Sequence, residues 1–421
     1  MFKGRLNPYA RSEKTLRTAA VVMKRNVFGL DSFRFKGDLK TRSMAYERFE
    51  LKLSGNHDSG FFAEVLHAPP LRRTEPAPLD LPFSELRAWR EALNRNGVSQ
   101  QATLALGKQL YVALFEGEIL RLWESSKAII GAGGGLRLRL DIRSPELALV
   151  PWEIIHDGCT YLALTVTTPI VRGMSFHRPA RIFDRETAPN VLLVTSSPTN
   201  AQKLSNLEAE VTSIERSLSS LVGDGRLGSC DVLSHATRQS LQYKLSHANY
   251  EVVHYIGHGA FDGQSGYLEL EDETGRTDRV DAVTLAQFFT DTSVRLLFLN
   301  SCETAIPSPV EASRGTAEAN LVVGIPAVVA MSAVVMDGVA SKFGQVFYKE
   351  LVEEHSIEYC MTEARKAITN YLTPYWAIPV LFTNATDSAP PVERGPTVVI
   401  NQHGKKNQVT REITEINYYS R

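Results

Sequence analysis

His258 and Cys302 are the residues whose types and positions point most directly to chemistry. Each follows a short apolar run, over 251–257 and 294–300, that is rich in Val, Ile, Leu and aromatic residues. Such runs are typical of buried strands in a parallel sheet. Because the chemistry of open α/β sheets lies beyond the carboxyl ends of the strands, two neighbouring strands would bring an imidazole and a thiol to one edge. A cysteine nucleophile with a histidine base requires that pair.

The predicted chemistry is nucleophilic attack by Cys302 with His258 as general base and acid. A thiol with the reference pKa of about 8.5 is only slightly ionised at neutral pH, so a nearby imidazole must take its proton. The backbone N–H groups of Gly259 and Cys302 are expected to form the oxyanion hole, and a glycine allows close approach of a substrate. The alternative is a structural cysteine, a core histidine and a glycine that ends a strand.

Metal and cofactor sites are not expected. His254 lies four residues before His258, but both belong to a strand pattern, so His254 is predicted to be structural. The glycine run 131–135 follows a helical pattern and precedes a strand, which is the reverse of the order in a phosphate-binding loop. No cysteine pair has metal-binding spacing; the four cysteines, which we expect to be reduced, are Cys159, Cys230, Cys302 and Cys360.

The composition is that of a globular chain without an expected membrane or nucleic-acid partner. Of the 421 residues, 43% are hydrophobic and 22% charged, and the formal net charge is -1. No apolar stretch reaches the length of a membrane span, and the first residues lack the apolar core of a secretory signal. These features predict a cytoplasmic location.

A basic segment opens the chain. Residues 1–44 hold eleven Lys or Arg against three acidic residues. A solvated arm is the simplest interpretation, and a docking or inhibitory segment is the alternative. Binding to nucleic acid rests on this arm alone and is the weakest hypothesis.

Between the two ends, the apolar pattern predicts an α/β protein. A hairpin over 46–66, a linker over 69–82, one helix over about 102–129 and a strand over 136–142 come first. Strands and helices then alternate, which predicts a mainly parallel sheet covered by helices on both faces. The expected strands are 191–195, 230–234, 251–257, 294–300, 326–332 and 378–383, with helices near 207–222, 238–248, 283–290, 313–324 and within 338–372.

Five ordered motifs together resemble the CHAT domain, a member of the caspase-like clan of cysteine peptidases that also includes separase and caspases. The two central motifs are His-Tyr-Ile-Gly-His-Gly over 254–259 and Leu-Asn-Ser-Cys-Glu-Thr over 299–304. The others are Leu-Val-Pro-Trp-Glu over 149–153, the strand and polar loop over 191–198, and Trp-Ala-Ile-Pro-Val-Leu-Phe over 376–382. The resemblance covers roughly residues 45–385.

The resemblance implies a caspase-like three-layer fold with a mainly parallel sheet flanked by helices, plus an N-terminal pseudo-caspase-like subdomain. The expected divisions are a basic arm over 1–44, the N-terminal subdomain over 45–185, the catalytic subdomain over 186–386 and a β-prone tail over 387–421. On this basis Pro151, Trp152 and Glu153 belong to the packing of the N-terminal subdomain and have no catalytic role.

The resemblance also implies a cysteine endopeptidase that cuts a partner protein after a basic residue. Relatives are often held as zymogens until a signal arrives, in bacterial stress responses or antiviral defence against phage. Asp337 and Asn300 are then the expected substrate-binding residues, although the segment around Asp337 lacks the tryptophan common in the family. A helix N-cap is the alternative role for Asp337.

The tail has two alternating apolar runs around Gly404, so it could form a hairpin or pair with the sheet edge of another chain. A frayed terminus is the alternative. The tail is therefore a candidate for self-association or for binding a regulatory protein. A catalytically silent scaffold or adaptor, acting through its terminal segments, is the alternative to the peptidase.

Overall fold

The computed structural model describes the chain from residue 44 to residue 384, with gaps. The described ranges are 44–69, 73–95, 97–131, 134–173, 188–201, 204, 207–261, 266–301, 317, 320, 324–333 and 335–384. The chain divides into two units after Arg42, and every described residue belongs to the second unit. The basic arm up to residue 43, the tail 387–421, Cys302 and most of the expected helix 313–324 lie outside the described residues.

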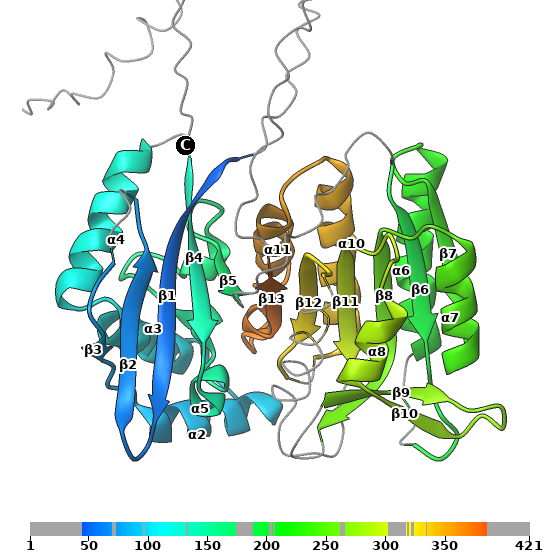
Figure 1. The fold of residues 1–421 in the computed structure, drawn as a ribbon, viewed down its shortest axis with the longest axis horizontal. Helices are drawn as coiled ribbons and strands as arrows, with labels where there is room; N and C mark the ends of the chain where they lie inside the picture. Colours follow the sequence, from blue (N-terminus) through cyan, green and yellow to red (C-terminus); the bar gives the residue numbers. More distant parts are fainter. Residues whose placement is uncertain are drawn as a thin grey trace, which may run out of the picture. The chain divides into compact units, whose positions relative to one another are not determined.

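One sheet runs through the described part of the chain (Figure 1). Its strands lie in the order β7 (Ser229–Leu233), β6 (Asn190–Thr195), β8 (Val252–Phe261), β11 (Leu296–Ser301), β12 (Ala327–Met331), β13 (Pro379–Thr383), β5 (Ile170–Gly173), β4 (Gly135–Ile142), β1 (Tyr46–Asn56), β2 (Gly60–His67) and β3 (Ala77–Pro78). A hairpin of β9 (Gly266–Glu271) and β10 (Thr277–Asp281) pairs with the last residues of β8.

The strand directions confirm the expected mainly parallel sheet. Strands β7, β6, β8, β11 and β12 are parallel to one another. Strand β13 is antiparallel to β12 and parallel to β5, and so joins this group to β5, β4 and β1, which are again parallel. Sequence-distant segments therefore meet where β13 contacts β5.

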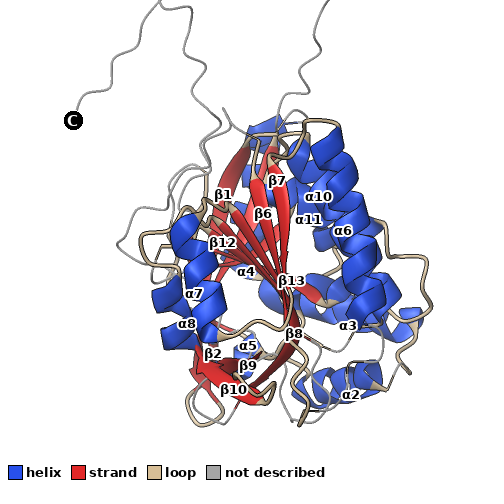
Figure 2. Ribbon diagram, turned by 90° about the vertical axis from the view of Figure 1, so that its right-hand side faces the viewer, coloured by secondary structure: helices blue, strands red, loops and turns tan. Residues whose placement is uncertain are grey.

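Helices cover both faces of the sheet, as the alternating pattern predicts (Figure 2). In the second half of the chain, α6 (Leu207–Gly223), α10 (Asp337–Val352) and α11 (Ile357–Lys366) lie on one face, and α7 (Arg238–His247) and α8 (Ala282–Phe288) on the other. The remaining helical elements are α2 (Phe83–Asn94), α3 (Gln100–Leu114), α4 (Gly117–Ile130), α5 (Pro145–Ala148), and the short 3₁₀ turns Trp152–Ile154, Leu162–Leu164 and Tyr375–Ala377.

Alternate side chains of the central strands fill two separate cores. Val252 and Ile256 of β8, with Phe298 of β11, pack in the core that includes α6 and α10 residues. Val253 and Tyr255 pack in the core that includes residues of α7 and α8. This two-residue period is why these strands are apolar throughout.

The single helix expected over about 102–129 is wrong. The structure has two helices there, α3 and α4, which are separated by Phe115 and Glu116. Gly117 then has a φ of 54°, a conformation that costs a glycine little and interrupts a continuous helix. Apolar residues recur at helical spacing on both sides of the break, so the sequence pattern does not reveal where one helix ends and the next begins.

Two buried arginines connect β4 to other elements. Arg137 of β4 pairs with Glu358 of α11 at 2.6 Å, and both side chains are at most 5% exposed. Arg139 pairs with Glu50 at 3.1 Å and donates to the carbonyl oxygen of Thr383 at 3.4 Å. Burial lowers the pKa of Arg139 from its usual value. Because an unpaired buried charge is costly, each of these pairs depends on both partners.

We expect Glu358→Gln to lower the free energy of unfolding by about 3–5 kcal/mol, because it removes the buried carboxylate that pairs with the guanidinium of Arg137. Urea unfolding followed by circular dichroism measures the change. Glu363→Gln is the matched control on the same helix, since Glu363 forms a partly exposed pair with Lys366 and should change stability by less than about 1 kcal/mol. Equal effects of the two substitutions would contradict this account of the junction.

Candidate active site

His258 lies near the end of β8 and is buried, with 6% of its surface exposed. The pairing of β8 with β11 places Ile256 opposite Asn300 and Gly257 opposite Ser301. By strand alternation, His258 and Ile256 share the sheet face that carries α6 and α10. Residues of two neighbouring strands thus come to the same edge, as the apolar runs predict.

Tyr255 fixes the backbone of His258. Its hydroxyl donates to the carbonyl oxygens of His258 at 2.8 Å and Glu269 at 2.9 Å, and burial raises its pKa. Gly257 is a glycine for the same reason, because a Cβ there would collide with the Tyr255 hydroxyl and the carbonyl oxygen of Ser196. This buried hydroxyl therefore ties the end of β8 to the adjacent hairpin.

The hairpin β9–β10 pairs directly with the residues around His258. His258 lies opposite Glu269 and Gly259 opposite Leu268 in an antiparallel register. The sequence did not predict this hairpin. It supports the part of β8 that follows the last described pair with β11, Gly257 and Ser301.

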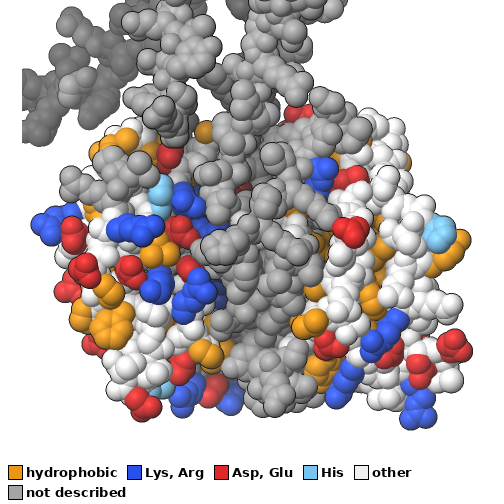
Figure 3. Space-filling model, viewed as in Figure 1, with side chains coloured by type: hydrophobic (Ala, Val, Ile, Leu, Met, Phe, Trp, Pro, Cys, Tyr) orange, Lys and Arg blue, Asp and Glu red, His pale blue; other side chains and the backbone are white. Residues whose placement is uncertain are grey.

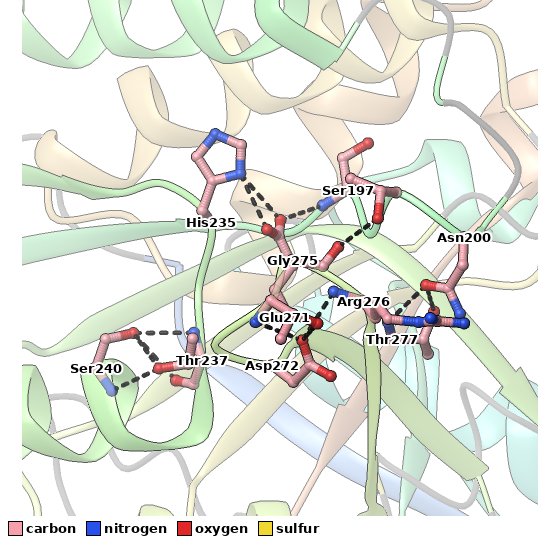
Figure 4. A network of polar contacts seen from close by, with 12 residues as sticks. Ser197, Asn200, His235, Thr237, Ser240, Glu271, Asp272, Gly275, Arg276 and Thr277 are labelled. Atoms are coloured by element: carbon pink, nitrogen blue, oxygen red, sulfur yellow. Dashed lines mark hydrogen bonds and ion pairs between the residues drawn. The ribbon is translucent and has the colours of Figure 1, made fainter.

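A polar network anchors the hairpin to the loops that follow β6 and β7 (Figure 4). The buried carboxylate of Glu271 accepts from the backbone N–H of Ser197 at 2.9 Å and contacts His235 Nδ1 at 3.0 Å. The side chain of Asn200 accepts from the backbone N–H of Thr277 at 2.7 Å. The hairpin is thus held in place from several elements.

Asn300 is buried and contacts a carboxylate on a helix. Its Nδ2 donates to Oε1 of Glu210 on α6, and the two residues are 2% and 4% exposed. Among the described residues, the Oδ1 of Asn300 has no hydrogen-bond partner. Glu210 was not predicted as a site residue, because in the sequence it occupies an ordinary polar position of an amphipathic helix.

A pocket of about 660 Å³ adjoins this pair. Its walls are the first turns of α6 and α10 and the segment after α11; the lining residues are Ala209, Glu210, Ser213, Gly338, Ser341, Lys342, Gln345, Ala367, Asn370 and Tyr371. A hydrogen bond of 3.0 Å from Gln345 Nε2 to Ser213 Oγ bridges the two helices. Because α6 and α10 follow β6 and β12, the pocket lies at the carboxyl edge of the parallel strands, where ligands bind in open α/β sheets.

Asp337 is the first residue of α10, and Met336 is the N-cap residue. The alternative role of Asp337 as the N-cap is therefore wrong. Its side chain lies outside the described residues, while its neighbour Gly338 lines the pocket. Cys302 also lies outside them, and the preceding residue Ser301 is the last residue of β11.

His254 has the structural environment expected for it. Its Nδ1 contacts the hydroxyl of Tyr348 at 3.0 Å, its ring stacks on Phe298 at 4.2 Å, and burial lowers its pKa to about 3. Within the described ranges, no three His, Cys, Asp or Glu residues are grouped as a metal site would require.

Trp152 and Glu153 also have the expected structural environment. Trp152 is fully buried and its indole donates to the carbonyl oxygen of Leu147 at 2.9 Å. Glu153 pairs with Arg172 at 2.7 Å. This motif packs the first half of the chain and contributes no group to the pocket.

None of the helices in the described residues has the length and apolar character needed to cross a membrane. On the face in Figure 3, described Lys and Arg side chains are interspersed with Asp and Glu rather than gathered into one basic patch. Mixed charges of this kind create no strong field of one sign.

Comparison with known proteins identifies one family. The family model described as "CHAT domain" matches residues 104–384, which is more than half of the chain. No curated protein matches the chain in sequence.

Three solved structures that match this chain are distant from it in sequence. Separase, in the separase–securin complex of Saccharomyces cerevisiae, is 13% identical with a TM-score of 0.50, and the match covers 82% of this chain and 30% of that one. The arginine-specific cysteine proteinase gingipain R is 13% identical with a TM-score of 0.37, over 72% of this chain and 73% of that one. The Drosophila initiator caspase Dronc is 14% identical with a TM-score of 0.32, over 52% and 92%.

We expect Tyr255→Phe to loosen the end of β8, because it removes the donor shared by two buried carbonyl oxygens. The free energy of unfolding should fall by about 1 kcal/mol, and backbone amides of 256–259 should exchange faster with deuterium. Tyr243→Phe, at an exposed site on α7, is the control and should change neither quantity. Unchanged exchange in Tyr255→Phe would show that the hydroxyl does not hold this strand end.

Proposed function

Because the chain belongs to the CHAT domain family, whose structural neighbours are caspase-like cysteine peptidases, we propose that it is a cysteine endopeptidase with Cys302 as nucleophile and His258 as general base and acid. One observation carries this proposal. Ser301, which directly precedes Cys302, is paired with Gly257, which directly precedes His258.

The pairing of β8 with β11 limits how far apart the backbones of His258 and Cys302 can be. Neighbouring strands lie about 4.8 Å apart, and consecutive Cα atoms about 3.8 Å apart. Cys302 and His258 each follow, after one peptide link, a residue of the same strand pair. A thiol and an imidazole that start from such positions are within reach of each other, which is the requirement of the dyad.

In the proposed reaction, His258 takes the proton of the Cys302 thiol and the thiolate attacks the carbonyl carbon of the substrate. The oxyanion of the tetrahedral intermediate accepts hydrogen bonds from the N–H groups of Gly259 and Cys302. Collapse breaks the C–N bond, and the leaving amine takes the proton from His258. A water molecule, deprotonated by His258, then hydrolyses the thioester and releases the acid and the thiol.

We further propose that the substrate is a protein cut after a basic residue. The pocket at the carboxyl edge of the sheet supports this, since its lining includes Glu210, which contacts Asn300, and Gly338, which is next to Asp337. Asn300 and Asp337 are the proposed substrate-binding residues. Regulation through a zymogen state and a role in defence against phage stay expectations from the family.

Peptide cleavage tests the proposed nucleophile and base. A fluorogenic library with Arg, Lys, Asp or Leu before the cleaved bond should be cut by the wild type, and not by Cys302→Ala. His258→Ala should lower the rate by about 10²–10⁴-fold, because the thiol loses its base. The exposed thiol of Cys159 offers a matched control, and Cys159→Ala should be fully active.

Cleavage that persists in Cys302→Ala would contradict the proposed nucleophile. A wild type that cuts no peptide, with a Cys302 that no thiol-reactive peptide labels, would favour the scaffold or adaptor alternative.

The tail is the proposed contact for self-association or for a regulatory protein. Separase is present in its solved structure together with securin, so a protein partner of this chain is a reasonable proposal. Deletion of residues 387–421 should reduce the molar mass seen by light scattering, or change the requirement for an activator in the cleavage assay. If neither quantity changes, the tail has no such role.

A further inference from the structure

Three titratable or charged residues form a row across the strands at the end of β8. His258 of β8 lies opposite Glu269 of β9, and Glu269 lies opposite Arg279 of β10. Directly opposite residues of antiparallel strands carry their side chains on the same face of the sheet, with Cβ atoms about 4.5–5.5 Å apart. The row therefore places a carboxylate between the histidine of the proposed dyad and a guanidinium.

The core contacts of the hairpin show which face of the sheet carries this row. Leu268 and Leu270, the residues on either side of Glu269, are buried in the core that includes residues of α7 and α8. By strand alternation, Glu269 faces the opposite side, which His258 shares with Ile256. The carboxylate and the imidazole thus belong to the same face.

The Glu269 carboxylate is largely shielded from water. Its side chain is 12% exposed and lies 3.4 Å from Nε of Arg279, whose side chain is 61% exposed. The Arg279 guanidinium also lies over the ring of Tyr267, 4.7 Å from its centre, which holds the guanidinium on the hairpin. Glu269 is one strand away from His258 and Arg279 is two strands away, about 4.8 and 9.6 Å. Because the carboxylate is nearer and less screened, its charge is the stronger one at His258.

Two buried acids on this strand and on a neighbouring helix have partners of their own. Glu271 of β9 contacts Nδ1 of His235, and Glu210 of α6 accepts from the amide of Asn300 on β11. Neither of these acids is paired with His258 in the strand register, in contrast to Glu269.

The described groups on the other packed elements do not offset the Glu269 carboxylate. His254 lies four residues before His258 on β8, and burial lowers its pKa to about 3, so it is neutral at pH 7. Lys342 of α10 is exposed, and water and salt screen its charge. Ser196, which begins the loop after β6, carries no charge.

We propose that Glu269 stabilises the protonated form of His258 and so favours the thiolate of Cys302. The assignment rests on the peptidase proposed above and adds to its dyad a residue that acts through His258. When the thiol proton moves to His258, the ring gains a positive charge, and a carboxylate within about 4–6 Å stabilises that charge. A cysteine beside a protonated histidine ionises more readily. Glu269 keeps its own charge throughout, and the proton passes from His258 to the leaving amine.

The test is the rate at which iodoacetamide alkylates Cys302 in the full chain at different pH values. Glu269→Gln keeps the size of the side chain and removes its charge, so the pH of half-maximal rate should rise by about one unit. Glu269→Asp, which keeps the charge, should stay close to the wild type. Peptide cleavage at pH 6 should show about tenfold lower kcat in Glu269→Gln with little change in KM, because the loss is in the reactive ion pair.

Arg279→Gln is the matched control, because it breaks the same ion pair from the other side. If Glu269 acted only by holding the hairpin together, the two substitutions would have equal effects. An action on His258 predicts that Arg279→Gln leaves the pH of half-maximal rate unchanged or lowers it. Glu273→Gln, at an exposed position of the hairpin turn, should change nothing. No rise in Glu269→Gln, or an equal rise in Arg279→Gln, would overturn the role of Glu269 and leave the peptidase intact.

A measurement on an inactive variant separates this proposal from the catalytic one. In Cys302→Ala, the ring signals of His258 are followed by NMR through a pH titration, and their midpoint should fall by about one unit when Glu269→Gln is added. Such a fall, in a protein whose Cys302 shows no reactivity that depends on His258, would support the Glu269 assignment and contradict the peptidase. Equal midpoints, with urea unfolding curves that show both proteins are folded, would overturn the assignment.

Discussion

The pairing of β8 with β11 is the constraint on which the rest of the site depends. Six consecutive residue pairs, from Val252–Leu296 to Gly257–Ser301, set the two strands in one register. A shift by one residue would turn every side chain to the opposite core, so both apolar faces protect the register. In the chain, His258 and Cys302 come directly after the last pair of this register, Gly257 and Ser301. The packing of the sheet core therefore supports the proposed dyad.

Contacts with other elements support the end of β8. The Tyr255 hydroxyl and the hairpin β9–β10 support the end of β8, and Glu271 links the hairpin to the loop after β6. In the part of the sheet beyond β13, the ion pair between Arg137 and Glu358 connects β4 to α11, the helix that follows α10 in the chain. Buried polar contacts therefore stabilise the fold and also support the end of β8. A buried polar or charged group that loses its partner costs free energy.

The sequence predicted the parts that depend on apolar periodicity. The strands that carry His258 and Asn300, the helices between them and the α/β class follow from local patterns, and the predicted family is confirmed. The hairpin β9–β10 was missed, because its strands are short and partly polar and its position depends on pairing with β8. Glu210 was missed because its contact, Asn300, lies 90 residues further along the chain. The roles of Cys302 and Asp337 stay predictions.

Covalent labelling is the most direct test of the central claim, that Cys302 is a nucleophile activated by His258. The wild type is treated with a peptidyl acyloxymethyl ketone that carries Arg at its reactive end, and the modified cysteine is located by mass spectrometry. We expect modification of Cys302, and much slower modification in His258→Ala. Modification of Cys159, Cys230 or Cys360 in place of Cys302, or an equal rate in His258→Ala, would contradict the proposed nucleophile and base.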